Sequence, residues 1–256
     1  MGQHGEHRPL VIRALALVAA ICLGAGAGSA QCRQALALGL DVSGSVDGQE
    51  YRMQLDGLAN ALTHPEIATI LTARSAAPVR ITVYEWSGAD DQRLLVTWRD
   101  IRNRTDLEQI AALLRTTRRA EADPGTAVGA AMLFGADLLA QQGECWKRTL
   151  DLSGDGKHNL GPHPRDVKAD LIRQGLTING LLIGTDPRFG QNRRYGQIGE
   201  LAAYYRSWVI LGPGAFTEVA LGFEEYQRAM VRKLIHELEA PAMSAIGPGH
   251  RPPAPQ

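Results

Sequence analysis

The sequence offers little that would draw the protein to nucleic acid or to a nucleotide. Its 27 Lys and Arg residues are matched by 27 Asp and Glu residues, so the formal net charge is zero and no general field attracts a polyanion. Walker loops and Gly-x-Gly-x-x-Gly fingerprints, which cradle phosphates, do not occur. No serine lies in a Gly-x-Ser-x-Gly elbow, the usual setting of a hydrolase nucleophile. We therefore expect no nucleic-acid partner and no nucleotide cofactor.

A long hydrophobic run is also lacking. The apolar stretch at residues 14–23 follows two arginines and is shorter than the ~20 residues that a membrane span needs. It is followed by a run of glycine, alanine and serine, which suits a cleavage site. These features predict a secretory signal peptide over residues 1–30, cut before Gln31, with a membrane anchor as the alternative. We expect a periplasmic or secreted protein with no stable membrane insertion after cleavage.

Cysteine is scarce, and its placement is informative. Of the three cysteines, Cys22 would leave with the signal peptide. Cys32 and Cys145 would remain, an even pair in a chain bound for an oxidising compartment.

The rest of the chain fits a single domain. Loss of the signal peptide removes two arginines and one glutamate from 27 residues of each sign, which leaves 25 basic and 26 acidic side chains. Residues 31–240 are enough for one α/β domain with a complete core. Residues 241–256 are rich in proline and glycine, and we predict that they form a disordered tail.

Strand-like and helical patterns alternate along this domain. The predicted strands span residues 36–42, 79–86, 93–98, 148–152, 176–183 and 208–211, and the predicted helices span 49–62, 66–74, 106–116, 127–141, 165–174, 197–205 and 216–238. This alternation predicts an α/β fold with a doubly wound, mostly parallel sheet of six strands. The hairpin spacing of residues 79–98 adds one antiparallel edge strand.

Oxygen-bearing side chains gather at two predicted strand ends and one loop. Asp41, Ser43 and Ser45 follow the first strand at alternate positions, and side chains two apart in an extended segment share a face. Thr126 precedes a predicted helix, and Asp155 follows a later strand. Doubly wound sheets bind ligands at the carboxyl ends of their strands. Such an all-oxygen set suits Mg²⁺, Mn²⁺ or Ca²⁺ better than zinc or copper.

A simpler interpretation of the first segment stays open. Ser43 and Ser45 precede a predicted helix by only a few residues, so either could serve as its N-cap.

The pattern Asp-x-Ser-x-Ser, then Thr, then Asp-Gly resembles the metal-ion-dependent adhesion site of von Willebrand factor A domains. The resemblance covers about residues 33–239 and extends to a bacterial secreted branch known only as a domain of unknown function. The motifs that carry the likeness to this branch are Tyr84-Glu-Trp-Ser-Gly88, Asp151-Leu-Ser-Gly-Asp-Gly156, Ile178-Asn-Gly-Leu181 and Gly212-Pro-Gly-Ala-Phe216.

The resemblance implies a role for each residue of the site. Ser43 and Ser45 would contact the cation directly, Thr126 directly or through water, and Asp41 and Asp155 would mostly hold metal-bound waters. Mg²⁺ is the first expectation, with Mn²⁺ and Ca²⁺ as alternatives. Neutral ligands leave a cation electron-poor, so a partner protein could bind it through an acidic side chain.

The resemblance also pairs the two remaining cysteines. The first and fourth strands are neighbours in von Willebrand A domains, and Cys32 and Cys145 each lie just ahead of one of them. We therefore predict a disulfide between these cysteines, at the end of the sheet opposite the metal.

Two alternatives remain. One is a von Willebrand A scaffold whose metal is purely structural. The other is a haloacid-dehalogenase-like phosphotransferase, whose late metal motif resembles Gly154-Asp-Gly-Lys-His-Asn159. That enzyme needs a second acid two residues after its nucleophilic aspartate, where this chain has Ser43, and a final acid where it has Asn159. We therefore expect a binding module with no catalytic residues.

Overall fold

A computed structural model describes Gly2 and residues 32–74, 76–184 and 191–239 of the protein. Apart from Gly2, the predicted signal peptide, its cleavage site before Gln31 and the predicted tail lie outside these residues. No helix in the described ranges is long and apolar enough to cross a membrane.

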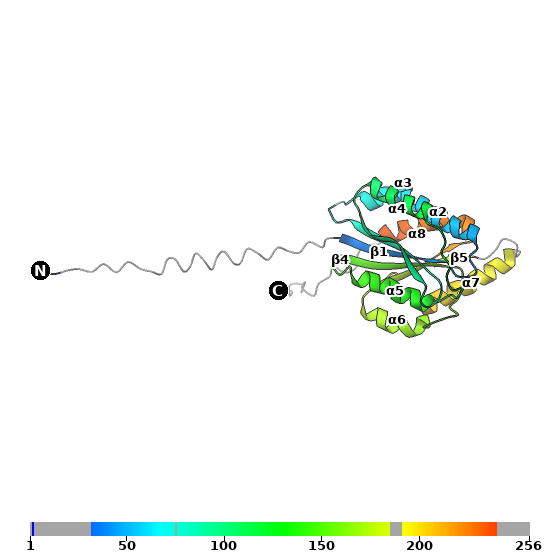
Figure 1. The fold of residues 1–256 in the computed structure, drawn as a ribbon. Helices are drawn as coiled ribbons and strands as arrows, with labels where there is room; N and C mark the ends of the chain where they lie inside the picture. Colours follow the sequence, from blue (N-terminus) through cyan, green and yellow to red (C-terminus); the bar gives the residue numbers. More distant parts are fainter. Residues whose placement is uncertain (1, 3–31, 75, 185–190, 240–256) are drawn as a thin grey trace, which may run out of the picture. The chain divides into compact units, whose positions relative to one another are not determined.

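The described residues form a six-stranded sheet between two layers of helices (Figure 1). The strands are β1 (Cys32–Asp41), β2 (Val79–Trp86), β3 (Gln92–Ile101), β4 (Cys145–Gly154), β5 (Thr177–Ile183) and β6 (Thr217–Ala220). The helices are α2 (Gly48–Thr63), α3 (Pro65–Thr72), α4 (Arg104–Thr116), α5 (Val128–Ala140), α6 (Pro164–Arg173), α7 (Gln191–Trp208) and α8 (Tyr226–Glu239), with a 3₁₀ turn η1 at Phe223–Glu225. The strand order is β3-β2-β1-β4-β5-β6, and every pair is parallel except β2–β3. The predicted fold class is confirmed.

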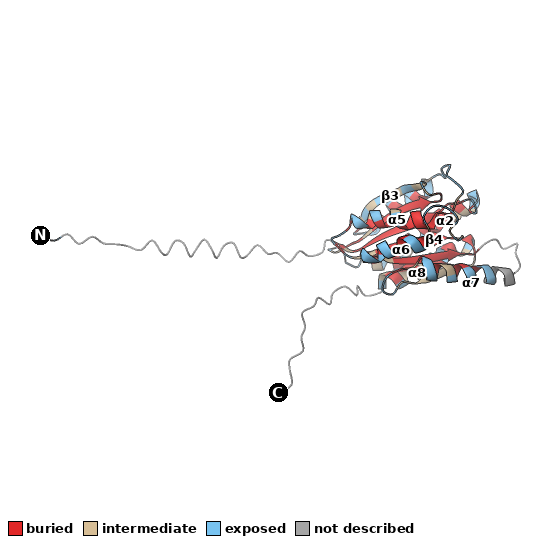
Figure 2. Cartoon of the chain, turned by 90° about the horizontal axis from the view of Figure 1, so that it is seen from below, coloured by how far each residue is buried: buried red, intermediate tan, exposed pale blue. Residues whose placement is uncertain are grey.

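Alternation of side-chain size along β1 sets the two helical layers. Leu36 and Leu38 face the layer that contains α2, α4 and α8, and Ala35 and Ala37 face the layer that contains α5, α6 and α7. The small side chains let helix α5 approach β1 closely, and the large ones fill the other side. Figure 2 shows the consequence, with the strands buried and the outward faces of the helices exposed.

The prediction for the end of the chain is wrong in detail. Residues 208–211 are not a strand: Trp208 ends helix α7, and Leu211 forms only an isolated bridge. The sixth strand lies instead within residues 216–238, which the pattern assigned to one long helix, and α8 begins only at Tyr226. A four-residue edge strand, mostly half-buried, is too short to show a two-residue period before the helical pattern begins.

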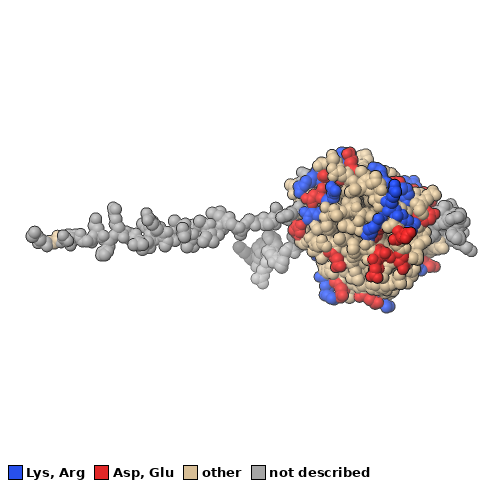
Figure 3. All heavy atoms as spheres, in the orientation of Figure 1, with Lys and Arg blue, Asp and Glu red and all other residues tan. Residues whose placement is uncertain are grey.

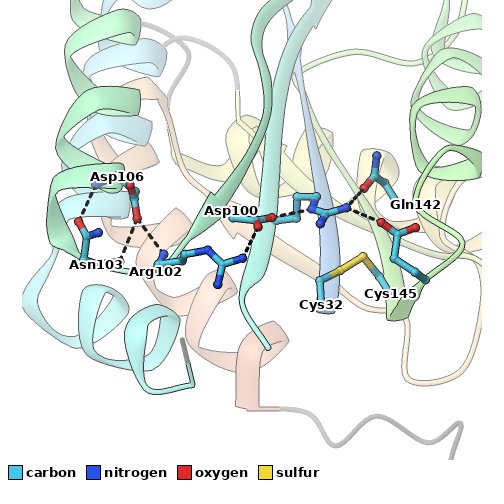
Figure 4. Close-up of polar contacts among 9 residues, drawn as sticks. Cys32, Asp100, Arg102, Asn103, Asp106, Gln142 and Cys145 are labelled. Atoms are coloured by element: carbon cyan, nitrogen blue, oxygen red, sulfur yellow. Dashed lines mark hydrogen bonds and ion pairs between the residues drawn. A yellow bond between two sulfur atoms is a disulfide. The ribbon is translucent and has the colours of Figure 1, made fainter. Parts of the chain in front are cut away.

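The sheet is fastened at the end where β1 and β4 begin (Figure 4). Cys32 and Cys145 are direct cross-strand neighbours with Cα atoms 4.7 Å apart, and they form the predicted disulfide. Beside it, Arg80 of β2 donates to Asp100 of β3 and to Glu144, both at 2.6 Å. A covalent bond and an ion-pair network therefore tie four segments together at one end of the sheet.

A buried charged cluster joins α8 to the sheet. Lys233 is fully buried and contacts the carboxylates of Asp151 on β4 and Glu237 on its own helix. Burial lowers the pKa of Lys233 to about 8, although Glu237 opposes this. The Gln34 amide of β1 donates to Glu237 at 3.0 Å. Loss of the Lys233 ammonium alone would leave two buried carboxylates without this cation, which would be costly.

Candidate metal centre

Four of the five predicted site residues form one connected cluster at the carboxyl ends of β1 and β4. The amide of Ser43 donates to Asp41 Oδ1 at 2.9 Å, and the hydroxyl oxygens of Ser43 and Ser45 lie 3.3 Å apart. The Ser45 hydroxyl donates to Asp155 Oδ1 at 2.7 Å, which links the two loops. The cluster can form because β1 and β4 are adjacent parallel strands, so their ends meet at the same edge.

The two serines are not helix caps. Asp47 is the N-cap of α2, and its carboxylate accepts from the amides of Gln49 and Glu50 at 2.8 Å. The alternative interpretation of Ser43 and Ser45 is therefore wrong, and both hydroxyls are available to the site. On the inner side, the Gln54 amide of α2 donates to the carbonyl of Asp41 at 2.9 Å, which holds the end of β1 against the helix.

Arg119 holds the serine loop from outside, a role that the sequence did not reveal. Its guanidinium donates to the carbonyls of Val46 at 2.5 Å and Val42 at 3.0 Å, and lies 5.8 Å from the Tyr51 ring centre. Carbonyl contacts of this kind leave no spacing pattern in the sequence. Figure 3 shows that basic and acidic side chains share the face of the molecule that is in view.

Thr126 is brought to the cluster by two backbone contacts. The amide of Gly44 donates to the carbonyl of Pro124 at 2.9 Å, which draws the threonine loop against the serine loop. Asn159 then holds Thr126 itself through two hydrogen bonds. The side-chain oxygen of Asn159 accepts from the backbone amide of Thr126 at 2.8 Å, and the backbone amide of Asn159 donates to the carbonyl of Thr126 at 3.1 Å. A Cβ added to Gly156 would lie 3.7 Å from the Thr126 hydroxyl, so that hydroxyl is beside the residue after Asp155.

The carboxylates of the site lack a compensating charge. Asp41 is fully buried, and its Oδ2 has no hydrogen-bond partner within the described part of the chain. Burial, and next the charge of Asp155, raise the pKa of Asp41 to about 7. Burial also raises the pKa of Asp155. A buried, unpartnered carboxylate oxygen beside a second carboxylate and two hydroxyls fits a hard divalent cation.

Tyr205 is a further neighbour that the sequence did not indicate. A Cβ added to Gly154 would lie 3.2 Å from Asp41 Oδ2 and would collide with the Tyr205 hydroxyl, so glycine permits both oxygens to come close. The Tyr205 hydroxyl is buried and, in the described ranges, also lacks a partner. Across those ranges, no group of three or more His, Cys, Asp or Glu side chains could hold a metal. The donor set here is one of hydroxyls and two carboxylates.

Asn159 offers a prediction about this geometry. Replacing Asn159 with alanine removes the acceptor for the Thr126 amide, and we expect about a tenfold loss of Mg²⁺ affinity because outer residues that orient ligands typically have effects of this size. Isothermal titration calorimetry measures it. Asn159→Asp, which keeps an acceptor oxygen, should retain most of the affinity. Equal affinities for Asn159→Ala and the unchanged protein would show that this contact does not position Thr126 for a cation.

Residues 31–242 match a family described as "Protein of unknown function (DUF1194)". The chain belongs to this family. A comparison with curated proteins finds no match.

Solved structures with the same fold come from several adhesive or matrix proteins. Proximal thread matrix protein 1 from the mussel byssus, with a zinc-occupied metal-ion-dependent adhesion site, has a TM-score of 0.54 at 16% identity and covers 81% of this chain and 48% of its own. Pilus adhesin SpaC from Lactobacillus rhamnosus GG has a TM-score of 0.55 at 11% identity and covers 81% and 31%. A von Willebrand factor type A structure from Catenulispora acidiphila has a TM-score of 0.50 at 15% identity and covers 79% and 42%.

These likenesses establish the architecture. The DUF1194 chain has the von Willebrand A fold, and it spans less than half the length of each of these solved chains. At such low identity the shared fold does not transfer an activity, so function has to be argued from the site itself.

Proposed function

We propose that this DUF1194 protein is a divalent-cation-dependent protein-binding module that acts outside the cytoplasm. The observation that carries the proposal is the buried Oδ2 of Asp41, which has no hydrogen-bond partner among the residues that the structure describes and lies beside the chain of contacts through Ser43 and Ser45 to Asp155. A buried carboxylate without a partner is costly, and a cation would neutralise it.

Each residue has a distinct part in the proposal. The hydroxyls of Ser43, Ser45 and Thr126 would touch the cation, and Asp41 and Asp155 would supply negative charge and hold its waters. Mg²⁺ is the expected ion, with Mn²⁺ or Ca²⁺ as alternatives. Weak neutral ligands leave most of the positive charge unquenched. An acidic side chain from a partner protein would then bind there as the remaining strong ligand.

Three observations support this reading. The cluster lies at the carboxyl end of a doubly wound sheet, where such folds bind ligands. A protein with the same fold has a zinc-occupied adhesion motif, and another is a pilus adhesin. The disulfide between Cys32 and Cys145, together with the predicted signal peptide, fits a periplasmic or secreted location.

The test compares partner capture with and without the metal. Immobilised protein should retain a partner from envelope extract in Mg²⁺ and release it when the cation is chelated. Ser45→Ala removes one exposed hydroxyl and should abolish both Mg²⁺ binding in calorimetry and Mg²⁺-dependent capture. Ser207→Ala, which removes an exposed hydroxyl on α7, is the matched control and should behave like the unchanged protein. Capture that is indifferent to chelation and to Ser45→Ala would contradict the proposal.

The same protein preparations also distinguish the two alternative functions, a phosphotransferase and a scaffold with a purely structural metal. A phosphotransferase should hydrolyse p-nitrophenyl phosphate with Mg²⁺ at a rate that falls sharply in Asp41→Asn, whereas a binding module should show no turnover. A purely structural metal would stabilise the fold in Mg²⁺ without promoting capture of any partner.

A further inference from the structure

A large cavity lies at the opposite end of the sheet, where β4 and β5 begin. Its volume is about 880 Å³, within the range of small-molecule sites. Strand β5 first pairs opposite Thr149, so residues 145–148 of β4 extend beyond it and form one wall. The cavity shares no residue with the metal cluster.

Two motifs that the metal cluster does not use build the other walls. Ile178 and Leu211 exchange two backbone hydrogen bonds at 2.8 and 3.0 Å, and the Phe216 amide donates to the buried Asn179 side chain at 3.1 Å. Gly212 has φ +91°, and a Cβ there would lie 2.5 Å from the Leu176 carbonyl oxygen, so only glycine allows this loop to approach β5 so closely. Asn179 and the loop at 212–216 therefore form a second wall of the cavity.

Large apolar side chains that are exposed to solvent line the cavity. Trp146 of β4 is 47% exposed and Ile172 is 58% exposed, and both line it. Phe216 lines the opposite side, with its ring centre 4.0 Å from that of His236. Large apolar side chains left in water beside a cavity favour a ligand with a flat apolar body.

The cavity also presents two cations that no acidic side chain neutralises through a hydrogen bond or ion pair in the described ranges. Lys147 donates to the carbonyl of Glu237 at 3.0 Å, and Arg148 donates to the carbonyl of Gln174 at 2.5 Å. The carboxylate of Glu237, the one acidic group in the lining, accepts instead from Gln34 and Lys233 in the interior. The two side chains leave opposite faces of β4, Lys147 toward α8 and Arg148 toward the end of α6, so Arg148 is the cation that shares a face with Trp146.

From this arrangement we propose a second binding site, for a small molecule that joins an anionic group to a flat apolar body. Arg148 binds the carboxylate or sulfonate of the ligand, and Trp146, whose side chain leaves the same face of β4, holds its apolar body. The inference is independent of the metal site and does not require a cation.

Calorimetry with 2-naphthoate and its uncharged amide, both in the presence of a chelator, tests the proposal. We expect naphthoate to bind and the amide to bind at least tenfold more weakly, because the amide lacks the charge that Arg148 recognises. Trp146→Ala and Arg148→Gln should each weaken naphthoate binding at least tenfold. Trp208→Ala, which removes another exposed tryptophan outside the cavity, is the matched control and should bind normally.

The outcomes are distinct. Failure of naphthoate to bind, equal binding of acid and amide, or equal losses in Trp146→Ala and Trp208→Ala would each overturn the proposal. Self-association that is lost in Trp146→Ala, without naphthoate binding, would assign the surface to a second copy of the chain and would also overturn it. Mg²⁺ binding at the metal cluster should be unchanged in all these variants, so failure here is distinguishable from failure of the proposed function.

Discussion

Replacing both Cys32 and Cys145 with alanine is expected to lower the melting temperature by at most roughly 8–20 °C. The bridge joins residues 113 positions apart, and the chain-entropy treatment gives about 4–5 kcal/mol for a loop of this length, as an upper figure. A domain of this size loses about 2–4 °C for each kcal/mol. Thermal unfolding followed by circular dichroism measures the shift, and chemical reduction of the unchanged protein should reproduce it.

The same variant carries an internal control. The bridge lies at the first residue of β1, and the metal cluster begins at Asp41, the last. A ten-residue strand spans about 30 Å, so the loss of the bridge should not disturb the cluster. Well below its melting temperature, the double variant should therefore bind Mg²⁺ like the unchanged protein. A melting temperature within about 2 °C of the original would mean that the ion pairs of Arg80 already hold this end of the sheet.

The sequence predicts the parts of this site that depend on local pattern. Asp41, Ser43 and Ser45 share one segment directly after an apolar strand, and a parallel sheet brings Asp155 to the same edge. The disulfide followed from strand order in the resembling family, and the structure confirms it. Whether the five predicted ligands hold a metal stays a prediction.

Other features depend on contacts between distant segments, and these have no sequence signature. Arg119 binds backbone carbonyls 73 and 77 residues away, and Asn159 holds the amide of Thr126 across 33 residues. The Tyr205 hydroxyl and Asp41 Oδ2 both come close to Gly154, and they can do so because this residue has no side chain. In the sequence, Asn159 is notable only because it replaces the final acid of an enzyme motif. In the structure, its side chain accepts a hydrogen bond from the Thr126 amide and so helps to position Thr126.

The position of the last β-strand was predicted wrongly for a related reason. Strand β6 is a four-residue edge strand that pairs only with β5, so three of its four residues are only partly buried. Tertiary pairing, not hydrophobic period, makes it a strand. Residues 208–211, which are more apolar, end a helix and contribute only one bridge to the sheet.

Asp41 gives the strongest prediction about the metal. Its folded-state pKa is raised from 3.8 to about 7, so the folded protein binds the proton more tightly than the unfolded chain does. Without metal, the contribution of Asp41 to stability is therefore lost as pH rises from about 4 to about 7. Above that range the ionised group destabilises the fold by on the order of 4 kcal/mol.

Asp41→Asn should reverse this pattern. The amide keeps an oxygen acceptor for the Ser43 amide and removes the buried charge. At pH 8 with a chelator, we expect the variant to resist urea more than the unchanged protein, by a few kcal/mol. Added Mg²⁺ should stabilise the unchanged protein, by about 2.7 kcal/mol at a hundred times its Kd, and leave the variant unaffected.

The comparison needs an exposed acid on another element than those that form the cluster. Asp170→Asn on α6 removes an exposed carboxylate that pairs with Arg173, and it should change neither the pH dependence nor the response to Mg²⁺. If Asp41→Asn is instead less stable than the unchanged protein at pH 8 without metal, the buried carboxylate is satisfied by the protein alone. If both proteins also respond equally to Mg²⁺, the ion binds elsewhere. Those two results together would remove the physical basis for a cation at the end of β1, because the unpartnered Oδ2 of Asp41 is what a cation would satisfy.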